Sequence, residues 1–188
     1  MVHMSAIVTL TGKIKFSARK LFTGGSMEES SYAGPGTVAL TPTMIGDAVS
    51  LDVSGSSPRL WHVTKSAYPA CTSGVQKETK AQGLGKALFS GSDLFIYRMT
   101  GQGVAWLTSY GAVEAIDLQP GEQHIVDNGH LVAWNCDYAI ERAGGGTWTI
   151  SKTGEGLVCW FTGPVKVYFQ TRNIDDFAAW VYQHSAQA

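Results

Sequence analysis

The chain has 188 residues, of which 44% are hydrophobic and 15% charged, and its formal net charge is −1. Intrinsic disorder is excluded, because disordered chains combine low hydrophobicity with high net charge. The chain also lacks the basic excess that is typical of nucleic-acid-binding proteins, so we expect no nucleic-acid partner.

The chain begins with a segment that resembles a cloning remnant, because Met1-Val2-His3 precedes a second methionine, Met4. We therefore predict that the domain begins at residue 5. Over Ser5–Phe16, apolar residues alternate with polar ones, which predicts a first strand. Most later segments are rich in Val, Ile, Thr and aromatic residues, which also predicts strands. These segments are Gly36–Leu40, Gly46–Val53, Leu60–Thr64, Leu94–Met99, Gly103–Ser109, Val113–Leu118, His124–Val126, Leu131–Asn135, Thr147–Ser151, Gly156–Phe161 and Val165–Thr171.

Two segments depart from this strand pattern. Thr72–Lys86 is polar and contains glycine, which predicts a linker-like break, and Pro69 just before it predicts a sheet edge or a bulge. At the other end of the chain, Asn173 can cap a short helix whose first turn is acidic. The apolar stripe of this helix consists of Phe177, Trp180 and Val181.

Similar strings recur about 67 residues apart. Leu21-Phe22-Thr23-Gly24 matches Leu88-Phe89-Ser90-Gly91, and a third, partial copy starts at Gly154. The strings predict internal repeats at about 21–75, 88–140 and, in part, 154–170, within one domain over 5–188. Together with the short strands, they predict an all-β fold: an antiparallel β-sandwich or barrel of internally repeated modules with a short C-terminal helix.

The densest polar string surrounds an Asp-Asn-Gly turn. His124 and His130 flank this turn, and with Asp127 they are our candidate catalytic residues, since imidazole and carboxylate groups exchange protons near neutral pH. With Asp127 or Glu122 the two histidines could instead bind a metal ion. The alternative is structural: Asp127 and Asn128 shape the turn, and His130 bonds to buried backbone. Since the HExxH motif is missing, we expect neither a metal nor an organic cofactor.

The cysteines bear on the cellular compartment. Cys71, Cys136 and Cys159 form no CxxC motif, which predicts buried, reduced thiols inside the cell. No run of about 18 apolar residues occurs, so we expect no transmembrane segment.

Aromatic residues are frequent, and two interpretations of them stay open. They could line a pocket for an apolar small molecule, in which a cofactor-independent isomerase or cyclase would orient its substrate. They could instead fill the core and an interface of a homo-oligomer, which the low content of charged residues favours. The candidate pocket residues are Trp61, Tyr97, Trp106, Tyr110, Trp134 and Trp160.

Several strings resemble the AIM24 family, named after altered inheritance of mitochondria. Gly101–Gly111 is one of them, and the two most specific are Val126–Trp134 and Gln170–Asn173. The resemblance runs from about Phe16 to Asn173. It implies a compact antiparallel β architecture of internal repeats, similar to the fold of the trp RNA-binding attenuation protein. The similarity of fold does not imply RNA binding.

The resemblance implies no established catalytic activity, so the expected function is that of a binding or assembly module. A mitochondrial role in membrane organisation is a further alternative. This chain departs from the family in Gly91-Ser92-Asp93, where the family has Gly-Glu-Gly, and in Gly163-Pro164-Val165, where it has Gly-Pro-Gly. It also shows no mitochondrial leader, which favours a cytoplasmic over a mitochondrial location.

Overall fold

The computed structural model describes residues 1–14, 28–42, 45–55, 60–81, 95–136, 139–142 and 157–185. The contacts divide the chain into two compact units, Met1–Thr43 and Met44–Ala188, and each is described here by itself. The strand expected at Thr147–Ser151 lies outside the described residues. The single domain and its three repeats remain predictions.

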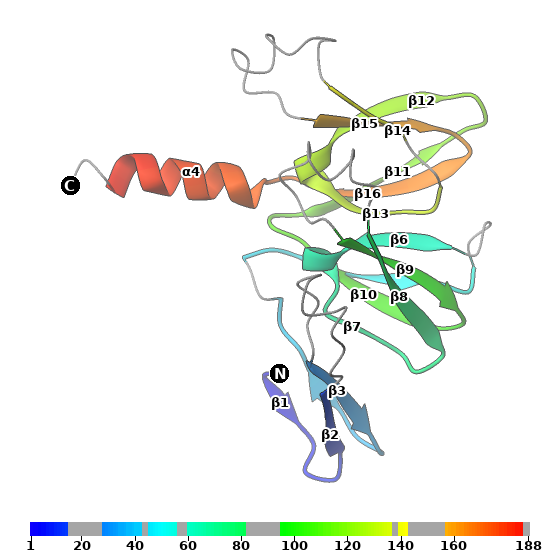
Figure 1. Cartoon of the computed structure of the whole chain (residues 1–188). Helices are drawn as coiled ribbons and strands as arrows, with labels where there is room; N and C mark the ends of the chain where they lie inside the picture. Colours follow the sequence, from blue (N-terminus) through cyan, green and yellow to red (C-terminus); the bar gives the residue numbers. More distant parts are fainter. Residues whose placement is uncertain are drawn as a thin grey trace. The chain divides into compact units, whose positions relative to one another are not determined.

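The first unit consists of two strand pairs (Figure 1). Its strands are β1 His3–Met4, β2 Thr9–Ile14, β3 Glu28–Ala33 and β4 Val38–Ala39. β1 pairs with β4, and β2 pairs with β3, both antiparallel. Of the described residues in this unit, Val8 is the one buried hydrophobic side chain. The described residues of this unit therefore form little apolar interior among themselves.

The second unit contains three antiparallel sheets. One sheet has the order β5-β10-β7, one the order β11-β16-β13-β6-β9-β8, and one the order β12-β15-β14. The strands are β5 Ala48–Asp52, β6 Trp61–Thr64, β7 Ala70–Cys71, β8 Val75–Ala81, β9 Phe95–Gly101, β10 Val104–Thr108, β11 Val113–Leu118, β12 Gln123–Asp127, β13 Leu131–Trp134, β14 Ala139–Arg142, β15 Leu157–Thr162 and β16 Val165–Gln170. Two 3-10 turns, η1 Lys65–Ala67 and η2 Asn128–His130, precede β7 and β13, and α4 Ile174–Ser185 follows β16.

These sheets confirm the all-β class and the C-terminal helix. None of the sheets in the described residues closes into a barrel. Val113–Leu118 matches β11 at both ends, and Asn173 caps α4 as predicted, because its Oδ1 accepts a hydrogen bond from the Asp175 N–H at 2.9 Å. The large six-stranded sheet is held together at its centre by β13 and β6, which pair through two residue pairs.

The break predicted at Thr72–Lys86 is wrong, because β8 lies inside it and pairs with β9 along its whole length. β8 is the edge strand of its sheet, and edge strands carry charged side chains that hide the usual apolar alternation. Its neighbour in the chain, β7, is also an edge strand, in agreement with Pro69 at a sheet edge.

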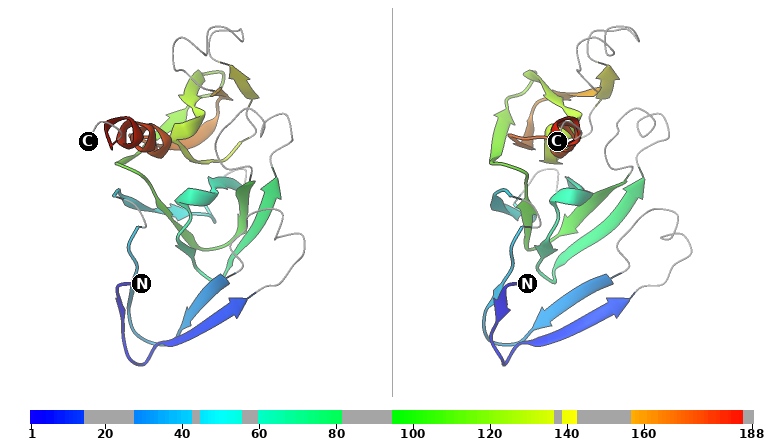
Figure 2. Two further views of the ribbon diagram at one scale, coloured as in Figure 1. Left: turned by 60° about the vertical axis from the view of Figure 1, so that its left-hand side comes forward. Right: turned by 90° about the vertical axis from the view of Figure 1, so that its left-hand side faces the viewer.

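The same nested pairing occurs in three groups of four consecutive strands: the first strand pairs with the fourth, and the second with the third. We call them the first block (β1–β4), the second block (β7–β10) and the third block (β13–β16). In the first two blocks even the register agrees, since the pair Ala70–Trp106 lies 67 positions after the pair His3–Ala39 at both residues. Figure 2 shows the two inner pairs, β2–β3 and β8–β9, as similar two-stranded ribbons.

Each block also contains the same side-chain contact. A side-chain oxygen of the residue that directly follows the first strand accepts a hydrogen bond from a backbone N–H at the start of the fourth strand or just before it. The pairs are Ser5 with Thr37 at 3.0 Å, Thr72 with Val104 at 3.0 Å, and Asn135 with Lys166 at 2.8 Å. Ser, Thr and Asn all supply a short side-chain acceptor, so the three blocks use different residues for one task.

Two hydrophobic clusters form the core of the second unit. One contains fully buried residues of β5, β6, β9 and β10, such as Val63, Met99 and Leu107. The other surrounds Trp134 and Phe161, on β13 and β15. The two clusters thus lie where the second and third blocks meet the strands that precede them in the chain.

Candidate functional site

The turn that carries two of the three candidate catalytic residues is held by one local hydrogen bond and by one bond to β16. Asp127 ends β12, and its Oδ1 accepts a hydrogen bond from the Gly129 N–H at 2.7 Å. His130 ends the turn, and its Nδ1 donates to the carbonyl oxygen of Gln170 at 2.7 Å. Because a carbonyl can only accept, this bond places a ring proton on Nδ1 and leaves Nε2 as the nitrogen for any proton transfer.

Gln170 joins this turn to a second loop. Its Oε1 accepts a hydrogen bond from the Tyr110 N–H at 2.9 Å, and its Nε2 donates to the Gly129 carbonyl at 3.2 Å. Gly129 also fits closely against Asn173, which lies 44 positions later, since a Cβ at residue 129 would collide with the side-chain amide of Asn173. The two most specific strings of the sequence therefore meet here, and we call Asp127, Gly129, His130 and Gln170 the junction.

His124 lies apart from the hydrogen bonds of the junction. It is exposed on β12, where its backbone pairs with Phe161. The structure thus brings Asp127 and His130 into one turn, and the hydrogen bonds of this turn described above do not involve His124. The catalytic role of the three residues remains a prediction.

Metal binding finds no support in this part of the protein. Among the described residues, no group of three or more His, Cys, Asp or Glu side chains is placed to hold a metal ion. Cys159 is buried as expected, but Cys71 and Cys136 are only half-buried. The prediction of three buried thiols is therefore wrong for two of them.

Three of the predicted pocket residues belong to the core. Trp61 and Tyr97 lie in the cluster around Met99, whereas Trp134 lies in the cluster with Phe161. The Trp61 ring packs against Tyr168 at a centroid distance of 5.7 Å. These rings fill space between strands, which agrees with the interpretation that aromatic residues build the interior.

The other three predicted pocket residues have different surroundings. Trp106 is 41% exposed on β10, and Trp160 is half-buried on β15. Tyr110 is buried, and its ring lies 5.8 Å from Phe177 of α4. The six residues are thus spread over several strands and both clusters, and a shared ligand pocket remains a prediction.

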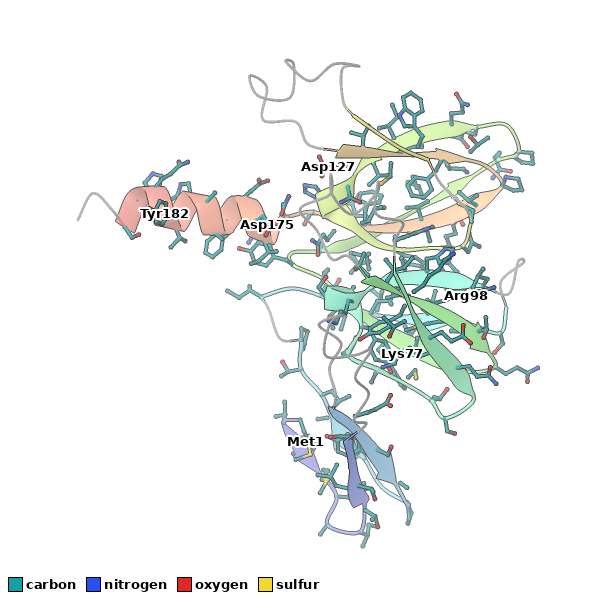
Figure 3. All side chains as sticks on the ribbon, viewed as in Figure 1. Met1, Lys77, Arg98, Asp127, Asp175 and Tyr182 are labelled. Carbon is teal, nitrogen blue, oxygen red and sulfur yellow. The ribbon has the colours of Figure 1, made fainter. Side chains whose placement is uncertain are left out.

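Sequence reasoning missed a charged residue on the edge strand β8. Lys77, labelled in Figure 3, holds its Nζ 4.1 Å from the ring centroid of Tyr68 and 4.7 Å from that of Tyr97. An ammonium group over aromatic rings is attracted by about 0.5–2 kcal/mol, depending on solvent exposure. The lysine therefore fastens the edge strand to its sheet. The sequence signal that could have revealed this strand is that Lys77 and Glu78 lie between two residues with high strand propensity, Val75 and Thr79.

Among the described residues, one ion pair raises the pKa of a lysine. Lys166 on β16 donates to Asp117 Oδ2 at 3.0 Å across the β11–β16 pair. This hydrogen bond raises the pKa of Lys166 above its ordinary value of 10.5, although partial burial acts in the opposite direction. The pair is largely exposed, so it contributes little to stability.

No described helix has the length and hydrophobicity needed to cross a membrane.

Comparisons with known proteins agree with the fold. The family model described as "Mitochondrial biogenesis AIM24" matches residues 1–172. An uncharacterized protein of Streptococcus pyogenes serotype M6 is 32% identical over 178 residues, which cover 93% of this chain and 68% of that protein. The crystal structure of a Streptococcus pyogenes protein, a structural genomics target, matches with a TM-score of 0.78 and 28% identity, covering 98% of this chain and 85% of that one.

Proposed function

The chain belongs to the AIM24 family, and we propose that it acts as a non-catalytic assembly module that binds a second copy of itself through α4. The observation that carries the proposal is the exposure of this helix. No residue of α4 is buried, although the helix carries five large hydrophobic side chains. They are Ile174, Phe177, Trp180, Val181 and Tyr182. Exposed apolar surface of this kind is typical of protein–protein contacts.

The helix is anchored at one end by aromatic contacts. Phe177 packs against Tyr110 and stacks with Trp180 at 6.4 Å, and Trp180 stacks with His184 at 4.3 Å. These four rings form a row along one side of α4, which we call the aromatic row. A row held in place before binding loses less conformational entropy when a partner packs on it.

The charges of α4 favour a second copy as the partner. Asp175, labelled in Figure 3, and Asp176 lie in the first turn, and His184 lies in the last. Two antiparallel copies would align opposite helix dipoles and would keep the two acidic first turns apart, at opposite ends of the contact. The helix has no Lys or Arg, so it offers nothing to anionic lipids.

The interface would be small. A helix of 12 residues is about 18 Å long, so two of them form a contact at the weak, transient end of known interfaces. We therefore expect a dimer that dissociates on dilution.

Light scattering after size exclusion, over a range of protein concentrations, tests the proposal. The wild type should show a concentration-dependent dimer, and Trp180→Ser combined with Val181→Ser should weaken the dimer by about tenfold or more, since buried aromatic anchors dominate such contacts. Gln183→Ser on the polar side is the matched control and should dimerise normally. A wild type that stays monomeric at all concentrations contradicts the proposal.

For the location of the protein in the cell, the comparisons give only the organism of the relatives. Both relatives come from a bacterium, which has no mitochondria. We propose a cytoplasmic rather than a mitochondrial location on this basis, and localisation of a tagged chain tests it.

A further inference from the structure

The second and third blocks are each covered by two strands that precede them in the chain. β5 pairs with β10, and β6 pairs with β9, in the second block. In the same way, β11 pairs with β16, and β12 pairs with β15, in the third block. Each time, one strand covers the fourth strand of the block and the next one covers the third.

The first block lacks such cover within the described residues. There β4 pairs with β1 alone, and β3 pairs with β2 alone. The free sides of β3 and β4 are the sides that are covered in the other two blocks.

Exposure of the apolar residues differs accordingly. Leu40, which follows β4, is 43% exposed, whereas Leu107 at the matching position 67 residues later is fully buried. Val38 on β4 is half-buried, whereas its counterpart Ala105 is fully buried. The first block thus presents an apolar strip that its counterparts cover with strands.

The backbone of β4 also offers unused hydrogen-bonding groups on this side. The carbonyls of Thr37 and Ala39 accept hydrogen bonds from the segment around β1, namely from the N–H groups of Ser5 and Val2. Because neighbouring residues of a strand point their backbone groups to opposite sides, Val38 directs its N–H and carbonyl away from β1. An incoming strand would pair with these groups.

We propose that the first block is a strand-acceptor site, at which a strand–turn–strand segment of another polypeptide chain pairs antiparallel with β4 and then with β3. The third block defines the chemistry of the occupant: two short strands that carry apolar residues, joined by the short turn at 119–122. Binding by strand addition takes its affinity from backbone hydrogen bonds and its register from alternate side chains. The proposal does not depend on α4.

The segment β11–β12 provides a probe with a defined register. The contact of Asn135 with Lys166 corresponds to that of Ser5 with Thr37, so Val167 corresponds to Val38. In the third block Ile116 pairs with Val167. A synthetic peptide with the sequence of Val113–Asp127 should therefore place Ile116 opposite Val38.

The test is hydrogen exchange of the full chain with and without this peptide. We expect slower exchange of the Val38 and Leu40 amides at saturating peptide. The same peptide with Ile116→Asp should bind at least about tenfold more weakly, because a charge would replace the central apolar contact. Calorimetry gives the affinities.

Two variants of the protein complete the test. Val38→Pro removes the N–H on the free side of β4 but no bond to β1, so it should abolish protection by the peptide. Leu40→Asp should weaken binding without disturbing the backbone, which keeps the test valid if Val38→Pro fails to fold. The proposal is overturned if the peptide leaves β3 and β4 unprotected, if it alters exchange only at β15 and β16, or if both variants bind it as the wild type does.

Discussion

Replacing Gln170 with leucine tests whether the junction is primarily a structural element. The substitution keeps the approximate volume of the side chain but removes both of its amide hydrogen bonds, to the Tyr110 N–H at 2.9 Å and to the Gly129 carbonyl at 3.2 Å. A typical hydrogen bond contributes about 1 kcal/mol net, and a buried group left without a partner costs about 1–3 kcal/mol. Tyr110 is buried, so we expect Gln170→Leu to lower the free energy of unfolding by about 2–3 kcal/mol.

Urea denaturation measures this loss. With a denaturant dependence of about 2 kcal/mol per molar urea, the midpoint should fall by about 1 M. Hydrogen exchange of the Tyr110 amide should also accelerate, because its acceptor is gone. Gln123→Leu, at an exposed position of β12, is the matched control and should change stability by less than about 0.5 kcal/mol. An unchanged midpoint together with a protected Tyr110 amide would refute the structural role of Gln170.

Two further predictions concern the core and the ion pair. Leu107→Ala should lower the free energy of unfolding by about 2–5 kcal/mol in urea denaturation, because Leu107 is fully buried. Leu40→Ala, at the matching exposed position of the first block, should lower it far less. Equal losses would contradict the comparison of the blocks. Asp117→Asn should lower the pKa of Lys166, which NMR titration measures. Because the pKa of Lys166 is raised in the folded state, the ion pair stabilises the fold fully below pH 10.5. This contribution, at most about 1 kcal/mol, is lost as the pH rises through the raised pKa.

The parts of the fold that could be predicted from sequence are those with a local cause. Four of the six residues of β11 are apolar, and α4 begins with a capping side chain and two acids. β3 was not predicted, because Glu28–Ala33 is mostly polar and shows no alternating apolar pattern. β8 was missed for a similar reason, since Lys77, Glu78 and Lys80 interrupt its apolar pattern, as charged residues do on many edge strands.

The sequence could predict the turn of the candidate site but not the distant residues that bond to this turn. The Asp-Asn-Gly string indicates a turn by itself, and a structural role was one of the three interpretations that it allowed. The partner of His130 is Gln170, which lies 40 positions later and reaches the turn only because β13 and β16 pair. No local pattern encodes such a contact. The same holds for Phe177 and Tyr110, which meet between a helix and a distant loop.

The middle of the six-stranded sheet has a mechanical consequence. The β11–β16–β13 half and the β6–β9–β8 half are joined by β13 and β6, which share two residue pairs, Ala133 with Val63 and Trp134 with His62. The ladders on either side are longer, with six pairs between β11 and β16 and seven between β8 and β9. Under load, this central seam is the place where the sheet would tear first, and each half would keep its own ladders after the tear.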